Sequence, residues 1–249
     1  YKRQIPETVK QISVLDRTKE PGSLGEPLYL DVVAALKGSR FESTPVFTGR
    51  YGLGSKDTTP AQIVLYKKIQ KNKITIGIVD DVTNLSLPVG APLVTTPEGT
   101  INCKFWGLGA DGTVGANKNS IKIIGHATDL YCQAYFVYDS KKSGGLTQSH
   151  LRFGDQPIHA TYLVSAADFV GVHAPTYVDK YDTTADLKDG GTYLLNCPWS
   201  AEELEERLPA KMKRDLANKH ANFYIIDAAK LAVQVGLGEK RTNNILQAA

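Results

Sequence analysis

Several features that define specialised classes of protein are scarce or missing in this sequence. It has three cysteines, Cys103, Cys132 and Cys197, which lie far apart and form no C-x-x-C pair. They therefore provide neither a disulfide framework nor a zinc or iron-sulfur site, and we expect reduced thiols in apolar surroundings. No window approaches the run of about 18 apolar residues that spans a bilayer, and the N-terminal YKRQIPETVKQ lacks the apolar region of a signal peptide. We predict a soluble protein in a reducing compartment, the cytoplasm.

The sequence also lacks any long run of charges of one sign. The 29 basic and 26 acidic residues are spread along the chain and leave a net charge of +3. This pattern argues against a nucleic-acid partner, so any anion must be held by a local site. No G-x-S-x-G motif occurs, and none of the five histidines has metal-ligand spacing to another histidine or to a cysteine. We therefore predict no catalytic residue and no metal ligand within these 249 residues.

Apolar runs alternate with helical patterns along the chain. In the first part the pattern predicts strands over 11–15, 45–49 and 74–79, a helix after Pro27 and a helix over 60–70. The second helix opens with Thr59-Pro60-Ala61-Gln62, which combines a capping box with proline at the first helical position. The segment 89–99, VGAPLVTTPEG, has linker composition and predicts a domain boundary.

The alternation restarts after this boundary. A helix is predicted over 113–124, and another is opened by the capping box of Ser200 and Glu203. The predicted strands of this second part are 100–106, 130–138, 159–164, 168–173, 192–197 and 222–227. Strands that alternate with helices indicate an α/β fold with two domains and mainly parallel sheets, whose functional edge lies at the carboxyl ends of the strands.

One loop in the second part resembles two phosphate-binding motifs. Gly107, Gly109 and Gly112 fit G-x-G-x-x-G between a strand and a helix, but the acidic residue that would hold a ribose, Asp139, comes too late for a dinucleotide fold. Read from Gly112 onward, the loop fits a nucleoside-triphosphate motif, except that asparagines replace the last glycine and the hydroxyl residue. Amides at a helix start with a lysine nearby still favour a phosphate ligand bound without metal. The alternative is that the glycines only allow close packing of helix and sheet.

A second glycine-containing loop also joins a strand to a helix start. It runs from Gly49 to Lys56, GRYGLGSK, and carries two basic residues, Arg50 and Lys56. Two such loops favour a ligand with several negative charges.

Long segments of the chain resemble a known family. The runs VLDRTKEPGSLGEPLYLDVVAAL, GRYGLGSKDTTPAQI, KFWGLGADGTVGANKNSIKIIG, YFVYDSKKSGGLTQSHLRFG and GGTYLLNCPWS are similar, in the same order, to the pyruvate:ferredoxin (flavodoxin) oxidoreductases, or pyruvate synthases. That family's polypeptides are several times longer. By this resemblance, residues 1–90 correspond to the end of domain II, which is transketolase C-terminal-like, and residues 98–249 to domain III, the gamma-type domain of 2-oxoacid oxidoreductases.

The resemblance also implies an activity and a set of cofactors. The family oxidatively decarboxylates pyruvate to acetyl-CoA and CO2 and passes the electrons to ferredoxin or flavodoxin. Thiamine diphosphate, its magnesium ion and the 4Fe-4S clusters belong to domains outside this chain, so the fragment is expected to be inactive alone. The implied partners are the remaining domains of the same polypeptide, ferredoxin or flavodoxin, and a second copy in a homodimer. In a eukaryote the compartment would be an anaerobic organelle.

Coenzyme A is the ligand that fits both the resemblance and the two loops. Its pyrophosphate and 3'-phosphate need amide donors and several cations, and it binds without metal. The predicted cofactor-binding residues are Arg50, Ser55, Lys56, Gly109, Thr113, Asn117, Lys118 and Asn119. Two alternatives remain open, namely a purely structural inter-domain module and a dinucleotide-binding oxidoreductase domain.

Overall fold

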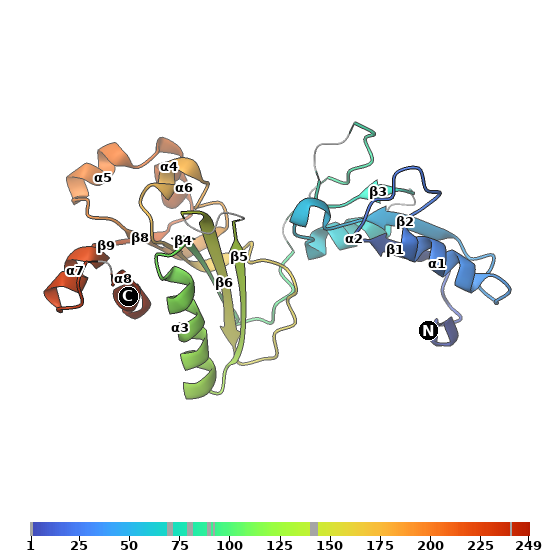
Figure 1. Ribbon diagram of the computed structural model, residues 1–249, viewed down its shortest axis with the longest axis horizontal. Coiled ribbons are helices and arrows are strands. Elements are labelled where there is room, and N and C mark those ends of the chain that lie inside the picture. Colours follow the sequence, from blue (N-terminus) through green and yellow to red (C-terminus); the bar gives the residue numbers. More distant parts are fainter. Residues whose placement is uncertain are drawn as a thin grey trace. The chain divides into compact units, whose positions relative to one another are not determined.

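The computed structural model describes residues 2–68, 72–78, 82–88, 91, 93–139, 144–239 and 241–249. The chain forms two compact units, Tyr1–Val94 and Thr95–Ala249. Each unit has its own sheet, and the sheets hold three and six strands among the described residues (Figure 1).

The first unit is built on a parallel sheet in the order β1-β2-β3, with β1 at Ile12–Asp16, β2 at Val46–Arg50 and β3 at Ile74–Thr75. Its helices are η1 (Lys2–Gln4), α1 (Pro27–Leu36), η2 (Leu53–Ser55) and α2 (Pro60–Lys68). Its core is formed by Tyr66, Ile74, Ile76 and Leu87. The strands are parallel, so their carboxyl ends meet at one edge of the sheet.

Local interactions explain where the helices of this unit begin. Both carboxylate oxygens of Asp16 accept hydrogen bonds from the first amides of α1, at 2.9 Å from Leu28 N and 3.1 Å from Tyr29 N. At α2 the predicted capping box is confirmed, because the Gln62 side chain accepts from Thr59 N and the Thr59 hydroxyl accepts from Gln62 N. Of the predicted helix 60–70, residues 69 and 70 lie outside the described residues.

The second unit holds a six-stranded sheet in the order β5-β6-β4-β7-β8-β9. Strands β4, β7, β8 and β9 run parallel, whereas β6 is antiparallel to both β4 and β5. The strands are β4 (Ile101–Leu108), β5 (Tyr131–Tyr138), β6 (Leu146–Gly154), β7 (Ala167–Val172), β8 (Leu187–Asn196) and β9 (Asn222–Ile226). The predicted α/β class with mainly parallel sheets is thus confirmed.

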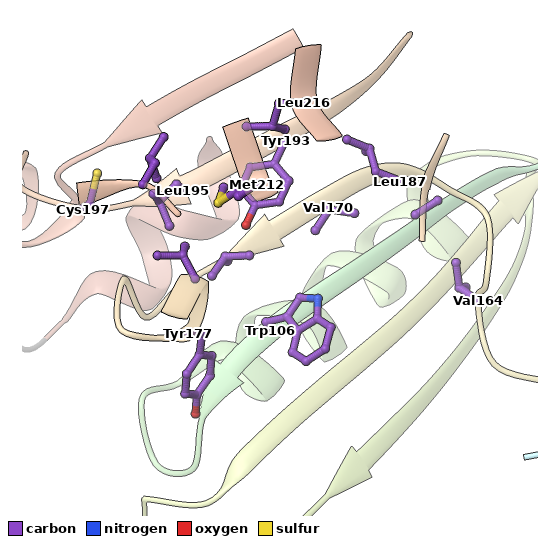
Figure 2. Close-up of a cluster of buried hydrophobic side chains, with 14 residues drawn as sticks. Trp106, Val164, Val170, Tyr177, Leu187, Tyr193, Leu195, Cys197, Met212 and Leu216 are labelled. Carbon is purple, nitrogen blue, oxygen red and sulfur yellow. The ribbon is translucent and has the colours of Figure 1, made fainter. Parts of the chain in front are cut away.

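Helices cover both faces of this sheet (Figure 1). They are α3 (Thr113–Ala127), α4 (Tyr177–Lys180), α5 (Ala201–Arg207), α6 (Ala210–Asn218), α7 (Ala228–Gln234) and α8 (Thr242–Ala248). The core of this unit includes Trp106 of β4, Tyr193 of β8 and Met212 of α6, and Figure 2 shows Met212 lying beside Tyr193. On the other side of the sheet, α3 contacts β4, β5 and β6, and α8 packs against α3 and α7.

Three sequence-based expectations about strands need correction. Residues 159–164 form no strand, because their backbone bonds to side chains of β6: Arg152 Nη2 donates to Tyr162 O, and Val164 N donates to His150 Nδ1. Strand β6 was not predicted. Its buried face carries the polar residues His150 and Arg152, so the sequence lacks the alternation of apolar and polar residues that indicates a strand. The strand expected over 74–79 ends at Thr75, shortly before Gly77 with its φ of 84°; residue 79 lies outside the described residues.

Candidate functional site

The glycine loop lies at the carboxyl end of β4, where α/β folds place their ligands. Its glycines allow close packing at two points. A Cβ atom at Gly107 would lie 2.6 Å from the Cβ and Oγ1 atoms of Thr113. Gly112 has a φ of 87°, and a Cβ there would lie 2.9 Å from the Cβ of Asn243 on α8. The packing alternative from the sequence therefore accounts for these two glycines.

The carboxylate of Asp111 accepts hydrogen bonds from one amide at the end of β4 and from one at the start of α3. Its Oδ2 atom accepts a 2.7 Å hydrogen bond from Leu108 N, and its Oδ1 atom accepts one of 2.7 Å from Thr113 N. The expectation that this helix start offers free amides to a phosphate is wrong for the amide of Thr113. A negative charge of the protein itself already lies at the positive end of the helix dipole.

Two of the predicted ligand residues point into the protein. Thr113 is 1% exposed, and its hydroxyl lies 2.7 Å from His173 Nδ1. Asn117 is 4% exposed, and its Nδ2 atom has no hydrogen-bond partner among the described residues. Burial lowers the pKa of His173 to about 4, although Asp111 opposes this shift. Thr113 thus links the start of α3 to His173, which directly follows β7.

The two following residues lie at the surface. Lys118 is exposed, and its Nζ atom lies 5.2 Å from the centre of the Phe136 ring. Asn119 donates from Nδ2 to Gln247 Oε1 on α8 at 3.2 Å. Lys118 can therefore reach a ligand in solution, whereas Asn119 would first have to release α8.

A hollow of about 430 Å³ opens beside the loop. Its described lining includes Gly109 and Asp111 from the loop, Val114 from α3, and Tyr138 and Thr147 from β5 and β6. The hydroxyl of Thr147 is buried and has no partner among the residues that the structure describes. Among the predicted site residues, Gly109 is the one that contributes to this described lining.

The first glycine loop follows β2 in the first unit. Arg50 ends β2 and forms an ion pair with Glu26, from its Nε to Glu26 Oε1 at 2.5 Å. Ser55, with a φ of 57°, and Lys56 are both exposed. Lys56 has no ion pair with any residue described in the structure. This loop presents cations, as the sequence predicted, but Arg50 already has an acidic partner.

Burial disfavours the reactive thiolate form of all three cysteines. Burial raises the pKa of the Cys103 thiol to about 12, and burial also raises the pKa of Cys132 and of Cys197. Within the described ranges, no group of three or more His, Cys, Asp or Glu side chains is placed to hold a metal ion. No described helix is long and apolar enough to cross a membrane.

Sequence reasoning missed the three side chains that organise these loops, namely Glu26, Asp111 and His173. Asp111 left a local signal, because aspartate close before a helix start often accepts hydrogen bonds from its first amides. Glu26 and His173 left none, since their partners Arg50 and Thr113 are 24 and 60 residues away.

Replacing Asp111 with alanine is expected to lower the free energy of unfolding of the second unit by about 1 kcal/mol, because the amides of Leu108 and Thr113 lose their acceptor. Urea unfolding followed by tryptophan fluorescence checks this, since both tryptophans, Trp106 and Trp199, lie in the second unit. Asp111→Asn keeps one acceptor oxygen and should cost less. Equal stability of Asp111→Ala and the unmodified chain would contradict the capping role.

The fold and its loops define a pair of α/β units with candidate ligand sites at the carboxyl ends of parallel strands. Comparison with known proteins then places them in a family. The family described as pyruvate ferredoxin/flavodoxin oxidoreductase matches residues 102–249, more than half of the chain. This chain belongs to the pyruvate ferredoxin/flavodoxin oxidoreductase family, and the resemblance seen in its sequence is confirmed.

Two curated relatives match almost the whole chain. The pyruvate:ferredoxin oxidoreductase of Moorella thermoacetica is 55% identical over 254 residues, which cover 100% of this chain and 22% of the relative. The pyruvate-flavodoxin oxidoreductase of Enterobacter agglomerans is 53% identical over 253 residues, which cover 99% of this chain and 21% of the relative. The chain thus spans about a fifth of the length of these relatives.

Among solved structures, the pyruvate oxidoreductase subunit PORC of Thermotoga maritima aligns with 60% of this chain and 74% of its own, at 18% identity and a TM-score of 0.46. At that score the likeness adds nothing to the family assignment.

Proposed function

We propose that this chain is part of a pyruvate:ferredoxin or pyruvate:flavodoxin oxidoreductase. In this reaction pyruvate loses CO2, its acetyl group is joined to the thiol of coenzyme A, and two electrons pass to ferredoxin or flavodoxin. The observation that carries the proposal is the 55% identity with the Moorella thermoacetica protein over the whole of this chain. The substrate and the acceptors are those in the names of the relatives, or those that the family resemblance implies.

Within that enzyme we assign this chain a supporting role. Residues 1–90 would form the end of domain II and residues 98–249 domain III. Thiamine diphosphate, magnesium and the 4Fe-4S clusters would be held by other domains, which are the chain's first partners. The complete enzyme would be a cytoplasmic homodimer, or a resident of an anaerobic organelle in a eukaryote. The length of the relatives, about five times that of this chain, supports this division of labour.

The chain's own contribution to chemistry would be part of the coenzyme A site. Arg50, Ser55 and Lys56 follow a parallel strand, where the exposed Lys56 ammonium can neutralise a phosphate. Lys118 offers a second exposed cation at the start of α3. Gly109 would line the ligand's path through the hollow described above. Thr113 would shape the loop through its buried contact with His173, and Asn119 through its hydrogen bond to Gln247 at the surface, while Asn117 would fill the space beneath α3.

Coenzyme A titration tests this role, using the complete polypeptide that carries this chain. Lys56→Ala and Lys118→Ala are each expected to weaken coenzyme A binding about threefold to tenfold, because each removes one charge-assisted contact to a phosphate. The expected kinetic signature is a higher KM for coenzyme A with kcat unchanged at saturation. Isothermal titration calorimetry measures the affinity, and acetyl-CoA formation measures the kinetics.

The matched control is Lys37→Ala. Lys37 is exposed and follows the end of α1, whereas Lys56 lies at the sheet edge where α1 begins. This control removes the same charge and should leave the affinity as it is. If Lys56→Ala and Lys118→Ala bind coenzyme A as tightly as Lys37→Ala and the unmodified protein, neither lysine contacts coenzyme A and the proposed site is wrong.

A purely structural role is the second candidate, and one observation favours it. Asp111 already accepts hydrogen bonds from the amides of Leu108 and Thr113, and the Thr113 hydroxyl pairs with His173, so these groups need no ligand. In that case both lysine variants should bind coenzyme A normally. Acetyl-CoA formation would then fall only when the chain is destabilised.

A further inference from the structure

Charged side chains gather at the carboxyl edge of the sheet in the first unit. β1 ends at Asp16 and β2 at Arg50, and these two residues are direct neighbours in the parallel register. Glu26 lies just before Pro27, the first residue of α1. The carboxylate of Asp16 is taken up by the first amides of α1, so the charges of Glu26 and Arg50 remain to be explained.

In the ion pair between these two residues, Glu26 is fully buried and Arg50 is partly accessible to solvent. The Glu26 side chain is 1% exposed and that of Arg50 is 13% exposed. Arg50 uses only its Nε atom, which donates to Glu26 Oε1. Its Nη1 and Nη2 atoms have no partner among the described residues, and neither is among the unpartnered buried atoms. The Nη1 and Nη2 atoms are therefore not fully buried, and their N–H groups remain available to a ligand.

An ion pair joined by a single hydrogen bond contributes little to the stability of the fold. A contact between both Glu26 oxygens and two Arg50 nitrogens would satisfy more of the buried carboxylate, yet Glu26 Oε2 is buried without a partner among the described residues. The arrangement instead restrains the long Arg50 side chain and leaves its fork free. Restraining a binding group before the ligand arrives removes part of the entropy cost of binding.

The surroundings favour an anion. Arg17 lies against Gly52, where its Nε atom would be 3.0 Å from an added Cβ. Arg17 and Lys56 are both exposed, and neither has an ion pair with the residues that the structure describes. Glu26 neutralises the charge of Arg50, so Arg17 and Lys56 would attract the anion. The Nη1 and Nη2 atoms of Arg50 would then hold it by two parallel hydrogen bonds.

We propose that Arg50 is a receptor for a phosphate or pyrophosphate oxyanion, which it binds through Nη1 and Nη2, and that Glu26 is the positioning residue that holds the guanidinium in place. The inference rests on the proposed function in one respect, because coenzyme A would supply the oxyanion in the enzyme. The receptor itself can be tested with inorganic pyrophosphate alone.

The experiment is a calorimetric titration of the complete polypeptide with inorganic pyrophosphate. Arg50→Ala and Arg50→Lys are both expected to weaken binding about tenfold, because a lysine cannot form the two-point contact. Glu26→Ala should weaken binding to the same extent. Glu26→Gln keeps the acceptor oxygen and loses the negative charge, so it should bind pyrophosphate about threefold more tightly. This opposite response to two substitutions at Glu26 would not arise from a merely structural role.

The control is Arg40→Ala, which removes an arginine whose exposed ion pair with Glu7 lies in the same unit. It should bind pyrophosphate like the unmodified protein. If Glu26→Ala does not fold, Arg50→Lys and Glu26→Gln decide the question. Normal binding by Arg50→Lys, or weaker binding by Glu26→Gln, would overturn the proposal.

The two proposals fail separately. If the pyrophosphate results are as expected but Lys56→Ala and Lys118→Ala bind coenzyme A normally, the receptor stands and its assignment to coenzyme A is wrong. If those lysine variants lose affinity for coenzyme A while Arg50 and Glu26 variants bind pyrophosphate normally, the coenzyme A site stands and the receptor does not.

Discussion

Lowering the pH from about 7.5 to about 5 is expected to reduce the free energy of unfolding of the second unit by about 4 kcal/mol. Two buried histidines are responsible. Burial lowers the pKa of His150 from 6.5 to about 3, helped by the charges of Lys104 and Arg152. Burial likewise lowers the pKa of His173 to about 4. At about pH 5 each histidine is neutral when folded and protonated when unfolded, which is worth about 2 kcal/mol apiece.

The sign follows from the depressed pKa values. The stabilisation from these histidines is fully present above 6.5, the pKa of the unfolded group. It is lost progressively as the pH falls toward about 4 for His173 and about 3 for His150. Urea unfolding at several pH values, followed by tryptophan fluorescence, measures the slope of the free energy of unfolding against pH.

Two variants separate the histidines from other titrating groups. His150→Gln should roughly halve the loss on going to about pH 5, because one of the two buried imidazoles is gone. His220→Gln is the control, since the side chain of His220 is 79% exposed. An unaltered slope in His150→Gln would show that His150 does not carry this pH dependence.

Replacing Gly107 with alanine is expected to lower the free energy of unfolding of the second unit by about 2 kcal/mol. The added Cβ would lie 2.6 Å from the Cβ and Oγ1 atoms of Thr113, a distance that forces the first turn of α3 away from β4. Thr113 cannot move freely, because it is 1% exposed and its hydroxyl contacts His173. Urea unfolding measured by tryptophan fluorescence gives the change.

Gly115 of the same loop and helix provides the matched control. It lies within α3, and no atom of the described residues comes within 4 Å of an added Cβ, so Gly115→Ala should raise the free energy of unfolding by about 0.5–1 kcal/mol. The two substitutions are chemically identical and should have opposite signs. Destabilisation of equal size by both would show that close packing at Gly107 is not the cause.

The family was recognisable because long segments of the chain carry it in order, and the match to residues 102–249 agrees. Elements with strong local signals were also predictable. The capping box at Ser200 is confirmed, with Ser200 N donating to Glu203 Oε2 and Glu203 N donating to Ser200 Oγ. Such elements depend on residues three or four positions apart, so the sequence carries their whole cause.

The glycine loop shows where local reasoning stops. G-x-G-x-x-G was read as a phosphate loop, but the motif does not reveal that Asp111 turns back onto the amides of Leu108 and Thr113. Nor does it reveal that Asn117 is buried. The contacts of Asp111 are local in the sequence, whereas the burial of Asn117 depends on how α3 lies against β4 and β6, which brings together residues far apart in the chain.

By itself, the sequence determined the family, the α/β class and the starts of α1, α2, α3 and α5, because these follow from runs of residues and from neighbours a few positions apart. Only the tertiary structure decided which polar side chains are available to a ligand. Arg50 meets Glu26 across 24 residues and Thr113 meets His173 across 60, and burial of those partners sets what each group can do. The Nη atoms of Arg50, which are unpaired among the described residues, and the burial of Thr113 are consequences of packing, which no local pattern encodes.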